Sequence, residues 1–260
     1  MSFRSSTQLE PCRFGIPPLD EILGGGVPRG SVLLLEDEVG IESEPIIIQF
    51  LSNGLRAGEY GYILSTEHPY SHYRHLLIPF GIDEVQLEMK RLIFLDGFSN
   101  PFGYTDIRTD VENVVRDISQ PRQIIDSIRR SILHVRTAQV RGVIDSLTTL
   151  LLVSDSLKPA LSFLQTKIAQ DKQRNFVSLL TLHTDVHEPH IIRAIEHHCD
   201  GVIRIEKPDP NSERPDAGTL SVRKMIGVSL GSLTTQFWYK FSPGSVELIP
   251  KTEDALEGII

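Results

Sequence analysis

The chain has 260 residues, a formal net charge of -8, 40% hydrophobic and 23% charged residues, and only two cysteines. This composition suits a soluble protein with one large α/β domain, and the acidic balance disfavours nonspecific nucleic-acid binding by the whole surface. No stretch approaches the roughly 20 uninterrupted apolar residues that span a membrane, no apolar secretory signal begins the chain, and two cysteines make no disulfide framework. We therefore expect a cytoplasmic protein with no membrane contact.

Short apolar runs alternate with helical stripes along most of the chain. The runs predict strands at 31–36, 60–66, 91–95, 141–145, 176–182 and 202–206. Helices are predicted between most of them, notably at 121–137 and 158–174, and this order favours a mostly parallel sheet covered by helices.

The last third changes character. Runs at 219–225, 234–241 and 246–249, separated by turn residues, predict antiparallel strands that extend the sheet. Segments 97–110 and 207–218 are rich in turn residues and predict surface loops. We expect a single domain at 13–250 between an N-terminal tail (1–12) and a C-terminal tail (251–260).

The junction between the first predicted strand and the next helix has the position of an ATP-binding P-loop. The pattern Gly-x-x-x-x-Gly-Lys-[Ser/Thr] uses its glycines to let backbone N–H groups wrap phosphates, its Lys to reach the outer phosphates and its hydroxyl to hold Mg²⁺. Here its four defining positions are Asp37, Glu42, Ser43 and Glu44, and Gly40 lies between them. The loop lacks every residue that makes the pattern work.

Five carboxylates surround this junction: Glu36, Asp37, Glu38, Glu42 and Glu44. Two like charges about 4 Å apart repel by roughly 1 kcal/mol in water and about 4 kcal/mol at a protein surface, so Mg-ATP is not expected to bind in the usual way. The helix that follows still has a proper start, with Ser43 as the predicted N-cap and Pro45 in the first turn.

Several motifs resemble RecA-type ATPases of the KaiC and RadA group. Gly15-Ile-Pro-Pro-Leu-Asp-Glu-Ile-Leu-Gly-Gly-Gly-Val-Pro-Arg-Gly-Ser resembles the start of their core, and later motifs extend the likeness to about residue 249. The resemblance implies a RecA-like fold, with Glu67 as the catalytic glutamate after the second strand and Asp145 as the Mg²⁺-linked aspartate of Walker B. It also places Lys224 where a neighbouring subunit's lysine reaches the nucleotide, and Ile226 where the family usually has an arginine.

Within that group, residues 30–43 resemble the fourth subunit of Elongator, in which an acidic stretch replaces the P-loop. The fourth, fifth and sixth Elongator subunits form a ring of six RecA-like folds that binds tRNA and assists the catalytic subunit in modifying the wobble uridine. The resemblance implies a comparable role here: a homo-oligomeric, hexameric ring that binds tRNA, works with an Elongator-like catalytic subunit and needs no cofactor.

Simpler interpretations stand beside these roles. Asp145 can be a strand-end capping residue, Glu67 needs a bound phosphate before it can act as a base, and Lys224 can pair with an acid across a subunit boundary. His183, His187 and His190 suggest a metal site, but their spacing is not diagnostic and solvated loop histidines are the alternative.

One segment of this acidic chain is basic. Residues 116–141 carry six arginines against two aspartates, a net charge of +4 that leaves -12 for the rest of the chain. The apolar stripe of the helix predicted at 121–137 leaves four of them on the other surface: Arg122, Arg129, Arg130 and Arg136. They predict either a solvated face or one that contacts RNA phosphates, with stacking of bases on Phe98, Phe102 or Tyr104.

Three functions remain open from these residues. The first is a catalytically degenerate, tRNA-binding ring subunit of an Elongator-like system. The second is a KaiC-like ATPase with residual ATP and Mg²⁺ binding through Glu67, Asp145 and Lys224. The third is a regulatory pseudo-ATPase that pairs with an active paralogue.

Overall fold

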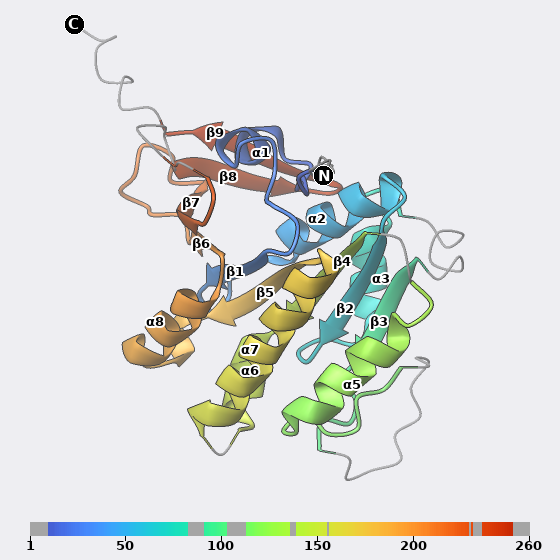
Figure 1. Cartoon of the computed structure of the whole chain (residues 1–260). Helices are drawn as coiled ribbons and strands as arrows, with labels where there is room; N and C mark the ends of the chain where they lie inside the picture. The colour runs from blue at the N-terminus through green and yellow to red at the C-terminus, as the bar shows by residue number, and fades with distance from the viewer. Residues whose placement is uncertain are drawn as a thin grey trace, which may run out of the picture.

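The computed structural model describes residues 10–82, 91–102, 113–135, 139–154, 156–228, 230 and 236–251. Nine strands form one sheet in the order β3-β2-β4-β5-β1-β6-β7-β8-β9 (Figure 1). Their bounds are β1 (Val32–Asp37), β2 (Tyr60–Ser65), β3 (Leu92–Asp96), β4 (Val140–Asp145), β5 (Val177–His183), β6 (Gly201–Glu206), β7 (Gly218–Met225), β8 (Gln236–Ser242) and β9 (Ser245–Pro250).

The first six strands in this order, β3, β2, β4, β5, β1 and β6, pair in parallel. The last three, β7, β8 and β9, extend the sheet with antiparallel pairing. This confirms the predicted RecA-like α/β architecture with an antiparallel C-terminal extension. β1 is buried on both faces: Leu33 and Leu35 join one core, and Val32 and Leu34 join the other. Side chains alternate along a strand, so an uninterrupted apolar run is what a strand between two helical layers requires.

Helices cover both faces of the sheet (Figure 1). The apolar side chains of α2 and α3 enter one core, and those of α5 to α8 enter the other. The helices are α1 (Pro17–Ile22), α2 (Glu44–Arg56), α3 (Tyr70–Leu77), α5 (Pro121–Ser131), α6 (Leu147–Leu152), α7 (Leu157–Arg174) and α8 (Pro189–His198). Among the described residues, no helix combines the length and apolar character needed to cross a membrane.

Helix α5 is shorter than predicted. It ends at Ser131, with Ile132 as C-cap, although the sequence pattern extends to 137. Ile132 is nevertheless buried and Val135 packs against the same core, because the turn after the helix keeps the apolar stripe facing inward. Arg136 lies outside the described residues, as does Tyr104.

Contacts of the folded chain reach both ends of the described residues. Cys12 is fully buried, and its backbone pairs with that of Val27. The ammonium of Lys251 lies 3.6 Å from the Trp238 ring centroid and donates to the Thr219 hydroxyl. Cys12 and Cys199 are both buried, free thiols.

Candidate functional site

The site lies where the parallel strands end. Since these strands run in one direction, their carboxyl ends meet at the same edge of the sheet, the usual ligand-binding edge of α/β folds. The register places Asp37 beside His183 and Ser65 beside Asp145. Polar residues that are far apart in the sequence therefore become neighbours.

The β1–α2 loop (residues 38–43) is held by hydrogen bonds to its own chain. The backbone N–H of Val39 donates to Asp185 (3.0 Å), and that of Ile41 donates to the carbonyl of Glu38 (3.0 Å). Gly40 takes a φ of 86°, which favours glycine at this turn. Ser43 occupies the N-cap position of α2 as predicted, but its side chain makes no capping hydrogen bond. The N–H groups of Val39 and Ile41 therefore already have hydrogen-bond acceptors within the chain.

Most carboxylates at the junction have a cationic partner or an imidazole. Asp37 lies 2.5 Å from His183, Glu36 lies 2.7 Å from Arg204, and Glu38 lies 3.8 Å from Lys207. The mutual repulsion expected from the sequence is thus offset by groups on neighbouring elements. Burial raises the pKa of Glu36 to about 7 in spite of Arg204.

His183 connects Asp37 with Glu67 across the edge of the sheet. Its Nδ1 contacts Asp37, and its Nε2 lies 3.1 Å from Glu67 Oε2. Hydrogen bonds that His183 donates to Asp37 and then to Glu67 raise its pKa to about 10, so the ring is a cation at neutral pH. The pKa of Glu67 is lowered: burial opposes this, but hydrogen bonds from His183 and Ser146 outweigh it.

Asp145 and Glu67, the two carboxylates to which the resemblance assigns catalytic roles, are engaged within the protein. Asp145 accepts hydrogen bonds from Thr181 (2.6 Å) and from the Tyr73 hydroxyl, and burial raises its pKa to about 6. Glu67 also accepts hydrogen bonds from Ser146 and from Thr149 (3.1 Å).

Lys224 lies away from these groups. Its ammonium donates to the backbone carbonyls of Glu196 (2.9 Å), His197 (3.3 Å) and Cys199 (2.6 Å) at the C-terminal end of α8. Cations at this end of a helix stabilise its unpaired carbonyls and its dipole. Within this chain, Lys224 is a helix-capping residue, a simpler role than either predicted one.

The arginines of α5 lie on a separate surface. The Arg122 side chain is 95% exposed and that of Arg129 is 56% exposed, and both approach Asp126, at 3.9 and 3.3 Å. A groove of about 550 Å³ runs beside them, with Arg116 and Arg130 in its lining. Phe98 and Phe102 are both partly exposed.

The histidines considered from the sequence, His183, His187 and His190, do not form a metal-binding group in the described part of the chain. His183 is held between two carboxylates and is not a solvated loop residue, while His190 lies inside α8, where the sequence favoured a loop. His68 and His72 were not identified from the sequence: His68 in the turn before α3 and His72 in the first turn of α3 both approach Glu44. Two histidines four residues apart were the available signal, but the pair spans a turn and a helix start, so no helical periodicity marked it.

Comparisons with known proteins agree with this architecture. The family model described as "ATPase: KaiC" matches residues 12–252. The UPF0273 protein of Thermotoga maritima is 30% identical over 218 residues, which cover 83% of this chain and 86% of that protein. A UPF0273 protein of Pyrococcus horikoshii is 32% identical over 222 residues, which cover 83% and 85%.

Solved structures share the fold. A KaiC-like protein of Pyrococcus horikoshii superposes with a TM-score of 0.69 at 21% identity, over 92% of this chain and 100% of that one. An uncharacterized protein of the same organism, solved in complex with an unknown peptide, gives a TM-score of 0.71 at 18% identity, over 92% and 99%. With a family match over nearly its whole length, this chain belongs to the KaiC family of ATPases, built on a RecA-like domain.

Proposed function

We propose that this chain is a catalytically degenerate KaiC-family subunit that acts by binding and assembly rather than by ATP hydrolysis. The observation that carries the proposal is the position of His183 between Asp37 and Glu67. These groups form an ion-paired cluster, one imidazolium between two carboxylates, at the end of β1, where the P-loop pattern requires a cradle for phosphate.

Phosphate binding would have to undo this cluster. A triphosphate needs free backbone N–H groups and a lysine, but the N–H groups of Val39 and Ile41 are bonded and the lysine position is Ser43. Asp37 is fully buried, so its charge is screened little by solvent and would repel an incoming anion. Asp145, already bonded to two hydroxyls, is a poor ligand for Mg²⁺ in this arrangement.

Nucleotide binding and turnover test the proposal directly. We expect the purified chain to show no saturable Mg-ATP binding by calorimetry and no phosphate release above background. An active KaiC-type ATPase, measured under the same conditions, is the positive control. Micromolar ATP affinity that disappears in Asp145→Ala would contradict the proposal and support an ATPase with residual activity through Glu67 and Asp145.

We further propose that the surface of α5 binds RNA. Arg122 and Arg129 expose most of their side chains, and the adjacent groove adds Arg116 and Arg130. Arginines in such a position contact phosphates without reading sequence, as expected for a folded RNA recognised by its shape. Asp126 weakens this surface, so several copies in a ring would be needed for useful affinity.

The proposed RNA is tRNA, and the proposed partner is an Elongator-like catalytic subunit; both rest on the resemblance of residues 30–43. We expect tRNA binding that weakens with salt, with a smaller salt slope in Arg129→Glu combined with Arg130→Glu. The matched control is Arg193→Glu combined with Arg214→Glu, which makes the same charge change at exposed positions elsewhere. Equal affinities for the two double variants would reject the α5 surface.

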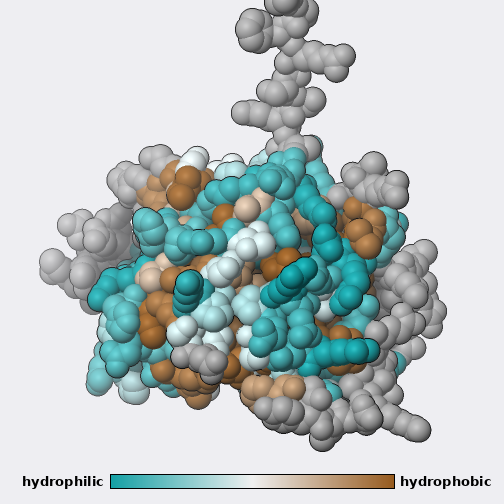
Figure 2. Space-filling view, turned by 60° about the horizontal axis from the view of Figure 1, so that its bottom comes forward, coloured by the Kyte–Doolittle hydropathy of each residue, from teal (hydrophilic) through white to brown (hydrophobic). Residues whose placement is uncertain are grey.

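A hexameric ring is the proposed assembly. The face in Figure 2 shows several separate apolar patches between hydrophilic areas. Described apolar side chains with high exposure are Val39, Ile78, Leu133, Leu152 and Ile226. Separate patches of this kind suit the two different contact surfaces that each subunit of a ring presents to its neighbours.

A further inference from the structure

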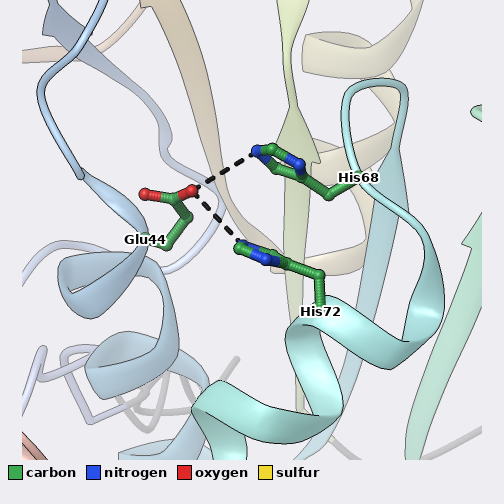
Figure 3. A group of neighbouring side chains, drawn as sticks. All are labelled: Glu44, His68 and His72. Atoms are coloured by element: carbon green, nitrogen blue, oxygen red, sulfur yellow. Dashed lines mark ion pairs between the residues drawn. The ribbon is translucent and has the colours of Figure 1, made fainter.

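Two histidines and a glutamate converge beside the β1–α2 loop (Figure 3). Glu44 is the first residue of α2, His68 lies in the turn before α3, and His72 lies in the first turn of α3. Glu44 Oε1 is 3.5 Å from His68 Nε2 and 3.4 Å from His72 Nε2. The three atoms lie within 4.8 Å of one another.

These separations fit a shared metal ion better than direct hydrogen bonds. A hydrogen bond between a ring nitrogen and a carboxylate oxygen is typically about 2.7–3.2 Å long. Zinc binds nitrogen at about 2.0–2.1 Å and carboxylate oxygen at about 2.0–2.2 Å, so tetrahedral geometry places two ligand atoms about 3.4 Å apart. Both measured contacts lie close to that value.

The burial of His72 Nε2 strengthens this interpretation. This atom is buried and has no hydrogen-bond partner, although buried polar atoms nearly always have one. In Figure 3 this nitrogen and that of His68 both point toward the same carboxylate. A cation between them would satisfy both nitrogens and Glu44 together.

Local structure holds these side chains in place before any ligand binds. The Ser65 hydroxyl donates to the carbonyl of His68 and accepts from its N–H, at 2.7 and 3.1 Å, which fixes the turn. The His68 and His72 rings stack with centroids 4.1 Å apart. Their side chains are 39% and 35% exposed, so an ion has a path from solvent.

We propose that Glu44, His68 and His72 bind one Zn²⁺ ion and leave its fourth coordination position open to water or to an external ligand. Two imidazoles and one carboxylate suit zinc, whereas Mg²⁺ prefers oxygen ligands and octahedral geometry. This site does not rest on the proposed loss of ATP binding, because two of its three ligands are imidazoles outside the P-loop positions, whereas the P-loop pattern holds Mg²⁺ through a hydroxyl.

Metal titration tests the site in the full chain. After removal of metals with a chelator, we expect one equivalent of Zn²⁺ to bind by competition with a chromophoric chelator, and Co²⁺ to give the intense visible absorption of a tetrahedral site. His72→Gln and Glu44→Gln should each lose the high-affinity equivalent and the cobalt spectrum. Unchanged circular dichroism would show that these partly exposed substitutions leave the fold intact.

The matched control is His187→Gln combined with His190→Gln, which removes the other histidine pair considered from the sequence. Zinc binding should be unchanged in this variant. Failure of the wild type to bind zinc, binding that survives in both His72→Gln and Glu44→Gln, or binding lost in the control would each overturn the proposal. None of these results depends on whether the chain hydrolyses ATP.

Discussion

Glu59 is the single carboxylate between two buried guanidiniums. It lies 2.7 Å from Arg29 and 2.8 Å from Arg141, and all three side chains are less than 10% exposed. Arg141 also donates to the backbone carbonyls of Phe50 and Arg13, at 2.7 and 2.5 Å, which ties α2 and the N-terminal segment to β4. Removing the carboxylate would leave two uncompensated charges in the core.

We expect Glu59→Gln to lower the free energy of unfolding at pH 7 by about 3–5 kcal/mol, the usual cost of removing one partner from a buried ion pair. Urea denaturation measures this change. Asp126→Asn is the control, because its ion pairs with Arg122 and Arg129 are exposed and contribute at most about 1 kcal/mol. Equal losses of unfolding free energy in Glu59→Gln and Asp126→Asn would contradict the prediction that the buried ion pairs contribute more to stability than the exposed ones.

The same group predicts a pH dependence in acid. Burial alone would raise the pKa of Glu59, but hydrogen bonds from Arg141 and Arg29 lower it to about 2 from an ordinary value of 4.5. A lowered pKa means that the stabilisation is complete above about pH 4.5 and is lost as the pH falls toward 2. The stability difference between wild type and Glu59→Gln should therefore shrink over this window, as measured by urea midpoints.

His183 predicts the opposite dependence, in alkali. Its pKa is raised from 6.5 to about 10, so the stabilisation from its contacts with Asp37 and Glu67 is complete below pH 6.5 and lost as the pH rises through 10. Thermal melting of wild type and His183→Gln should show a difference that decreases between pH 7 and 10. A difference that stays constant would mean that His183 acts through packing alone.

At the scale of single elements, α2 shows how a packing contact can override helix propensity. Gly54 lies inside this helix, where alanine would ordinarily be favoured by about 1 kcal/mol. A Cβ atom at this position would lie 2.2 Å from Nε of Arg141, whose guanidinium also covers the Phe50 ring. The glycine thus makes room for the buried arginine of β4.

We expect Gly54→Ala to destabilise the protein by about 1–3 kcal/mol, the typical cost of overpacking a core. Denaturant unfolding measures the change in the free energy of unfolding, and the sign of this change is the decisive result. Gln173→Ala, at an exposed position of α7, should change stability by less than about 0.5 kcal/mol. A stabilised Gly54→Ala variant would show that Arg141 can move aside without cost.

At the scale of the whole molecule, exposed apolar side chains bear on assembly. Ile226 is 57% exposed and lines a small groove with Gly30 and Lys172, close to the turn that follows β7. The side chain that faces outward here is therefore apolar and uncharged. An apolar residue on an accessible groove suits a contact between subunits.

Native mass spectrometry tests the proposed ring. We expect an assembly of six chains of 29.2 kDa each, and dissociation toward smaller species in Ile226→Glu, because a charge buried at a subunit contact is costly. Glu213→Lys, at an exposed loop position, is the control and should leave the mass unchanged. A wild type that is monomeric at micromolar concentration would contradict the ring.

Local pattern predicted most of the fold. Apolar runs placed all nine strands to within two residues at the ends that the structure describes, because buried strands need uninterrupted apolar sequence and antiparallel ones show turn residues between them. The end of α5 could not be predicted, since Ile132 and Val135 face the core from a turn as well as from a helix. The acidic residues that replace the P-loop pattern at Asp37 and Glu44 were also identified from the sequence, because the pattern involves only residues close together in the chain.

The sequence by itself determined the RecA-like order of elements and the absence of the P-loop residues between Asp37 and Glu44, because both depend on residues close together in the chain. Only the tertiary structure decided how the resulting charges are balanced. His183 reaches Asp37 through the pairing of β5 with β1, and His68 and His72 reach Glu44 through the approach of α3 to α2. These partners are separated by many residues, so no periodicity brings them together; the parallel register of the sheet brings together the first pair, and helix packing brings together the second group.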